Sequence, residues 1–275
     1  MGKRLAYIFI PVLLAAALLQ IVFGNPDLRA FAFPVNVAIL LALAGGLYVL
    51  NRERGDSRTV AALASGTAGV TLMALTAVGS LPIAFCPEAA WQQSWVFGAV
   101  LLLLMTNLLL AVFRYRGRFR WRFYLNHIGL LVLTAALAFG AADMERLRAA
   151  VNIGERIDCA YDEAGMPRAL GYTLRVEKFE ASFYANNAPA DFRAVVSADG
   201  RSRTLRVNHP WHKSWKEDIY LTGYDATAGS ASEYCILEFV VQPWKYVALG
   251  GLLAFLAGAL LMIWGGKKNG KHELG

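Results

Sequence analysis

Long apolar runs separated by short polar segments make up most of the chain. A run of about 20 apolar residues is long enough to cross the hydrocarbon core of a bilayer as a helix. Six runs meet this length, and the chain is therefore predicted to be an integral membrane helical bundle. We expect membrane spans at about residues 5–23, 31–50, 60–85, 95–113, 123–142 and 246–264.

The third run, 60–85, differs from the others in its side chains. It is rich in Gly, Ala, Ser and Thr and contains few bulky residues. Small residues gain little from lipid contact but allow neighbouring helices to approach closely. This pattern predicts that the third span lies at the centre of the bundle.

The segment 143–243 has a different period, in which apolar and polar residues alternate. Leu174 and Val176, for example, alternate with charged neighbours, as in a strand with one buried face. Asp199-Gly200 is a strong signal for a two-residue hairpin, because both turn positions need a positive φ. We therefore expect an all-β domain, an antiparallel sandwich or an open barrel, inserted between spans five and six. The expected strands cover about 172–177, 192–198, 201–207, 218–224 and 234–241.

Charge placement sets the expected topology. The chain carries 27 Lys and Arg against 20 Asp and Glu, and 57% of its residues are hydrophobic. The basic residues gather in alternate loops, which is the pattern of cytoplasmic loops rather than of nucleic-acid binding. We expect both termini to lie in the cytoplasm and residues 143–243 to lie outside the cytoplasmic (inner) membrane. The lipid bilayer is the expected partner, and no binding of nucleic acid is expected. The basic segments are 1–4, 51–58, 114–122 and 267–271.

His127 is the only histidine in any predicted span, and it follows the arginine-rich segment 114–122. Ionisable groups inside a bilayer are costly and usually functional. The alternative is a neutral histidine that is satisfied by a carbonyl on a facing helix. Asn126, beside it, is an equally plausible interhelical hydrogen-bonding residue. By helical period, the residues that share a face with His127 are Phe123, Tyr124, Leu130 and Leu131.

The cysteines and the other histidines give weaker signals. Cys159 and Cys235 both lie in the predicted external domain, where a disulfide between them could persist. The alternative is thiol exchange with a partner, but the CxxC spacing that tunes a reactive thiol is missing. His209 and His212 are three apart without a completing ligand set, and this favours a solvated loop over a metal site. The third cysteine, Cys86, is interpreted as a packing residue.

Several short motifs follow one another along about residues 95–264. They are Asn126-His127-x-Gly129-Leu130, Phe179, Phe192, Val207-Asn208-x-Pro210, Ile219-Tyr220, Tyr224-Asp225, Pro243-Trp244, Gly250, Gly251 and Gly258. Their order resembles the ResB (Ccs1) family of cytochrome c biogenesis. Five spans precede the external domain, where the family more often has three. Gln242 stands where the family usually has Asp, and Trp215-Lys216-Glu217 replaces a usual glycine.

The resemblance implies one half of a system II cytochrome c synthase, not an autonomous enzyme. The other half is a CcsA-type membrane protein with a tryptophan-rich WWD motif, which this chain lacks. Haem b would be the transported substrate, with His127 as a candidate axial ligand and Asn126 as a weaker supporting residue. Apocytochrome c and a thioredoxin-like thiol reductant would be further partners, and no metal beyond haem iron is expected.

Two other classes of protein share features with this sequence. A b-type cytochrome with two bis-histidine haems needs four membrane histidines, and the predicted spans contain one. A non-enzymatic scaffold or sensor, whose external β domain binds a periplasmic protein, stays open as the alternative. No catalytic residue can be named from the sequence.

Overall fold

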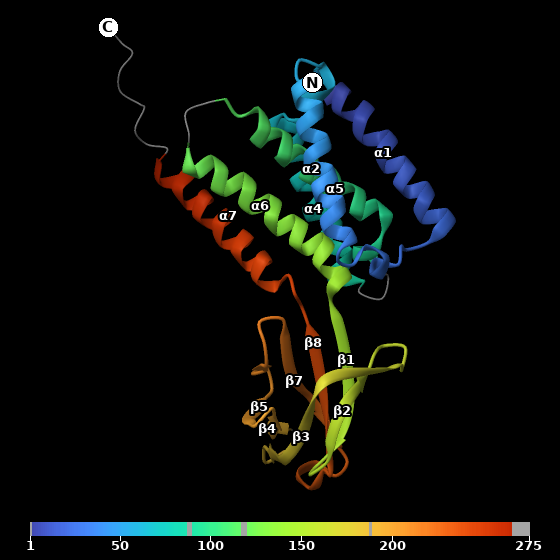
Figure 1. Cartoon of the computed structure of the whole chain (residues 1–275), viewed down its shortest axis with the longest axis vertical. Coiled ribbons are helices and arrows are strands. Elements are labelled where there is room, and N and C mark those ends of the chain that lie inside the picture. The colour runs from blue at the N-terminus through green and yellow to red at the C-terminus, as the bar shows by residue number, and fades with distance from the viewer. Residues whose placement is uncertain (1, 87–89, 117–119, 187–188, 266–275) are drawn as a thin grey trace. The chain divides into compact units, whose positions relative to one another are not determined.

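The computed structural model describes residues 2–86, 90–116, 120–186 and 189–265, and the chain forms two compact units (Figure 1). The membrane unit consists of Met1–Ala142 together with Trp244–Gly275. The β unit consists of Asp143–Pro243. Part of the arginine-rich segment, Arg118, and the basic tail after residue 265 lie outside the described residues.

The membrane unit is helical. Its helices are α1 (Gly2–Phe23), α2 (Val35–Arg54), α3 (Arg58–Leu63), α4 (Gly66–Phe85), α5 (Trp95–Arg114), α6 (Trp121–Gly140) and α7 (Lys245–Gly265). Short 3₁₀ turns lie at Leu28–Phe31, Trp91–Gln93 and Ala141–Asp143. Among the described residues, six helices, all except α3, are long and apolar enough to cross a membrane. Many of their large apolar side chains are exposed, as expected for lipid contact. The chain is therefore a multi-pass membrane protein.

The third predicted span is interrupted, which corrects the expected helix over 60–85. Helix α3 ends at Leu63, and α4 begins at Gly66. Ser65 causes the restart, because its hydroxyl oxygen accepts a hydrogen bond from the backbone N–H of Ala68 and caps α4. The same hydroxyl donates to the carbonyl of Ala62 at the end of α3.

Helix α5, rather than the small-residue helix α4, lies at the centre of the unit. It contacts α1, α2, α3, α4 and α6. Its buried side chains include Leu104, Met105 and Leu110, each at most 2% exposed. The prediction for the third span was wrong because small residues permit close packing but do not by themselves fill a core.

Helices α6 and α7 pack closely through glycines. A Cβ atom at Gly129 would lie 2.4 Å from the backbone nitrogen of Phe255, and one at Gly251 would lie 2.6 Å from that of Leu133. A Cβ at Gly258 would lie 2.5 Å from the backbone nitrogen of Asn126. These three positions therefore allow backbone-to-backbone contact along the helix pair, as small residues do in membrane interfaces.

The β unit is a single antiparallel sheet in the order β5-β4-β3-β2-β1-β8-β7-β6. A short 3₁₀ turn, Gly229–Ala231, precedes β8. The strands are β1 (Glu145–Asn152), β2 (Arg156–Tyr161), β3 (Pro167–Phe183), β4 (Pro189–Ala198), β5 (Arg201–Arg206), β6 (Trp211–His212), β7 (Glu217–Tyr224) and β8 (Tyr234–Val241).

This sheet curls around one core, which favours the open barrel over the sandwich. The end strands β5 and β6 are joined by a tight turn in which Arg206 and His209 exchange backbone hydrogen bonds. The core collects the inward side of every strand, including Leu174 and Val176, which are fully buried as the alternation predicts. Asp199 and Gly200 both have positive φ, as the predicted hairpin requires.

Candidate functional site

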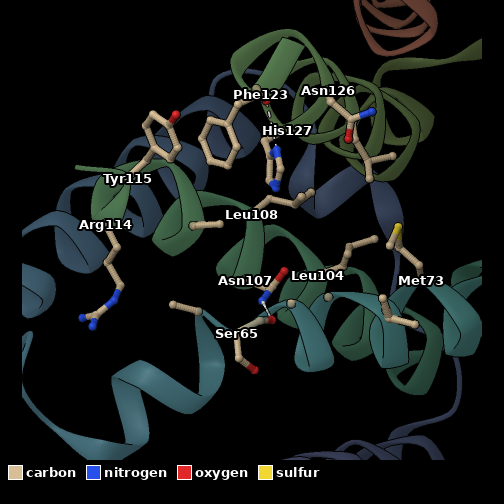
Figure 2. A pocket seen from close by; sticks show the side chains of 16 residues that line it. Ser65, Met73, Leu104, Asn107, Leu108, Arg114, Tyr115, Phe123, Asn126 and His127 are labelled. Carbon is tan, nitrogen blue, oxygen red and sulfur yellow. Dashed lines mark hydrogen bonds between the residues drawn. The ribbon is translucent and has the colours of Figure 1, made fainter. Parts of the chain in front are cut away.

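A cavity of about 550 Å³ lies between α4, α5 and α6 (Figure 2). At one end, its lining reaches the end of α5 at Arg114 and the first turn of α6 at Phe123, and Arg120 and Arg122 lie at the start of α6. We call this part of the membrane unit the basic end. The cavity contains both residues singled out in the sequence, His127 and Asn126.

The His127 ring is fixed by its own helix. Its Nδ1 lies 2.9 Å from the carbonyl oxygen of Phe123, one turn earlier in α6. A carbonyl can only accept, so Nδ1 carries the hydrogen and Nε2 of the neutral ring keeps a lone pair. Figure 2 shows the ring pointing from α6 into the cavity. The carbonyl of a facing helix, which the alternative interpretation required, is not its partner.

A stack of aromatic rings orients His127 further. The Phe123 ring lies 4.1 Å from the His127 ring on one side and 4.1 Å from the Tyr115 ring on the other. The predicted aromatic face is therefore corrected in part. Phe123 lines the cavity with His127, but Tyr124 lines a separate apolar hollow beside α7. Of the other two predicted members of this face, Leu130 lines the cavity, and Leu131 packs against the helical core.

Asn107 is a polar residue of the cavity that the sequence analysis missed. It lies in the middle of α5 and is 4% exposed. Its amide nitrogen donates to the carbonyls of Leu63 (2.5 Å) and Ser65 (3.1 Å), at the break between α3 and α4. Gly69 makes room for it, since a Cβ there would lie 2.8 Å from Asn107 Oδ1. An asparagine inside a span was the available signal.

Arg114 is the second residue that was not singled out, because its whole segment was interpreted as a topology signal, with attraction of haem propionates by the arginine run as an additional possibility. Its Nη1 donates to the carbonyl of Gly55 (2.6 Å) and to Asn51 Oδ1 (3.3 Å), which joins the ends of α5 and α2. It is the only arginine or lysine among the described residues that line the cavity. The cavity wall thus combines one cation, one imidazole and an otherwise largely apolar surface.

The expected disulfide is not formed. Cys159 and Cys235 are both free thiols, and β1 lies between the strands β2 and β8 that carry them. Adjacent strands are about 4.8 Å apart, so two strands' separation exceeds the ~7 Å that a disulfide can bridge. Burial raises the pKa of the Cys235 thiol to about 12, so it is protonated at neutral pH and a poor nucleophile.

The two histidines of the β unit, His209 and His212, belong to no metal-binding group among the described residues. His212 lies in β6, and its Nδ1 is 2.7 Å from Oδ1 of the buried Asp218, a carboxylate that the sequence analysis did not place there. His212 thus lies in a short strand rather than in a loop, but its side chain is 69% exposed, as expected for a solvated position. The described residues contain no group of three His, Cys, Asp or Glu side chains that could hold a metal ion.

Taken together, the fold and the cavity define a multi-pass membrane protein with an appended β unit and one imidazole directed into a cavity between its helices. Residues 111–245 match the model of the ResB-like family, and over this segment the protein is ResB/Ccs1-like, as its sequence motifs predicted. The matched segment runs from the end of α5 through α6 and the β unit, and includes His127. No curated protein matches the chain.

Proposed function

We propose that this protein is the membrane subunit of a system II cytochrome c synthase, in which His127 holds haem b for transfer to apocytochrome c. The ResB-like family match supports a role in cytochrome c biogenesis. The observation that carries the haem assignment is the His127 ring, whose Nδ1 is engaged by a carbonyl while Nε2 faces the cavity. Ligand pockets of this kind typically have volumes of roughly 300–1,000 Å³, and this cavity lies within that range.

The chain's own contribution is binding and orientation of this cargo. The carbonyl of Phe123 fixes the tautomer, so that in the neutral ring Nε2 keeps the lone pair that would coordinate iron. The stacked rings of Phe123 and Tyr115 and the apolar wall would lie against the porphyrin. A partner helix would supply the opposite axial ligand, because α1–α7 carry no second histidine among the described residues.

The proposed orientation places both termini and the basic end in the cytoplasm and the β unit outside. It is supported by the basic residues at the ends of α2, α5 and α6. A cysteine introduced at Asp199, which lies in the β4–β5 turn, should react with a membrane-impermeant thiol reagent in intact cells whose outer membrane, if present, is permeabilised. Labelling only after lysis would contradict this orientation.

The function is tested by maturation of a reporter cytochrome in a host without other maturation systems. Covalent haem should form only when this chain and a CcsA-type partner are expressed together, because neither half is complete. The purified pair should show a haem spectrum. Full maturation without this chain would overturn the proposal. A pair that binds a periplasmic protein but never contains haem would support the scaffold alternative.

A further inference from the structure

We propose that Arg114 binds a propionate carboxylate of the haem cargo and thereby sets its orientation in the cavity. This inference rests on the proposed function and adds to it a residue that selects for an acidic porphyrin. Three observations carry it: the polarity of the cavity along its length, the unpaired charge of Arg114, and the position of His127 between the two ends.

The cavity is polar at one end and apolar at the other. Figure 2 shows Arg114 at one end and Met73 at the other, with His127 and Asn107 between them. The helical rise gives the scale. Leu104 lies ten residues before Arg114 on α5, or about 15 Å along the helix axis. An amphipathic ligand therefore meets charge near the basic end and hydrocarbon further along the cavity.

The guanidinium of Arg114 is held in place but not neutralised. Both of its hydrogen bonds go through Nη1 to uncharged oxygens, of Gly55 and of Asn51. Among the described residues, Arg114 forms no ion pair with a carboxylate. Its Nη2 and Nε remain available, and a guanidinium is the group best suited to bind a carboxylate with two parallel hydrogen bonds.

Haem carries two propionates on one edge and its vinyl groups on the other half of the ring. With iron at His127 Nε2 and a propionate at Arg114, the vinyl edge lies toward the apolar end, near Met73 and Leu104. The opposite orientation would place carboxylates against methionine and leucine side chains and leave the arginine without a counterion, which is costly away from water. The cavity therefore favours one orientation of the ring.

The test compares two probes on the purified complex: iron protoporphyrin IX and its dimethyl ester, which keeps the ring but lacks both charges. The unmodified complex should prefer the diacid. Arg114→Gln should reduce this preference about ten- to a hundredfold, as expected for a lost charge-assisted bond, while binding of the ester changes little. Affinities are measured by titration of the Soret band.

Three variants control the experiment. Arg122→Gln removes an arginine at the basic end that does not line the cavity, and should keep the preference. Asn51→Ala removes a neutral partner of Arg114 without removing the charge of the arginine, and should also keep the preference for the diacid. Arg114→Lys keeps the positive charge but cannot form the two parallel hydrogen bonds, and should retain part of the preference.

Equal affinity of the unmodified complex for diacid and ester would overturn the role of Arg114 while leaving haem binding by His127 intact. A preference that survives in Arg114→Gln would overturn it as well. Failure of the unmodified complex to bind either porphyrin would remove the proposed function and this inference together.

Discussion

The two units use apolar residues in opposite ways. In the β unit the large apolar side chains are inside, and Ile219, Leu237 and Phe239 are fully buried in one core. In the membrane unit many of them are outside, and Ile263 in α7 is 80% exposed. Lipid removes the drive to bury such side chains, so this unit is held by close backbone contacts and interhelical hydrogen bonds. Its interior can therefore contain a cavity with polar groups.

The comparison also shows where each unit uses its polar residues. The β unit carries several ion pairs, mostly at its surface, such as Arg206 with Asp191 (2.7 Å). Such exposed pairs contribute at most about 1 kcal/mol each. In the membrane unit, Asn107 and Arg114 instead satisfy backbone carbonyls at helix ends. These two polar side chains thus hold helix ends together and also line the cavity.

The largest effect is expected from opening the core of the β unit. Phe239→Ala removes a fully buried ring and should destabilise this unit by about 3–5 kcal/mol. The matched control is Leu253→Ala in α7, whose side chain is 58% exposed and should change stability by about 0.5 kcal/mol or less. The two variants are compared by the temperature at which half of the protein in isolated membranes becomes susceptible to proteolysis. Equal shifts for both variants would contradict the comparison.

A smaller effect is expected at the contact between α6 and α7. Gly251→Ala places a methyl group against the backbone of Leu133 and should cost about 1–3 kcal/mol through forced separation of the helices. The neighbouring Gly250 has open space at its Cβ position, so Gly250→Ala is a matched control that should be neutral. Thermal aggregation of the detergent-purified protein, followed by size-exclusion chromatography, gives the two melting temperatures. Equal melting temperatures for the Gly251→Ala and Gly250→Ala variants would contradict the close contact between α6 and α7.

Much of the fold follows from periodicity, and the parts that do not have identifiable reasons. Runs of apolar residues predict the six long helices, and alternation predicts most of the strands. The first strands, β1 and β2, were missed because alanines such as Ala149 and Ala160 give a weak apolar signal, although both are buried. The interruption between α3 and α4 was missed because Ser65-Gly66 was counted as part of a small-residue run rather than as a helix cap.

Of the candidate site, the sequence singled out His127 and Asn126 but not the other polar residues that line the cavity. His127 stands out because an ionisable residue within an apolar span is rare. Asn107 and Arg114 are separated from it by a helix connection, and only the packing of α5 against α6 shows that they share its cavity. The disulfide between Cys159 and Cys235, one of two alternatives left open by the sequence, does not form because the strand order places β1 between their strands.

The central claim is that His127 coordinates haem iron, and its most direct measurement is the optical spectrum of the complex carrying His127→Gly. His212→Gly, which removes an exposed histidine of the β unit, is the matched control. The account predicts that His127→Gly leaves protein level and partner association intact, loses most of the haem, and regains it when imidazole is added to fill the vacated coordination position. Full haem content with an unaltered spectrum in His127→Gly would contradict it.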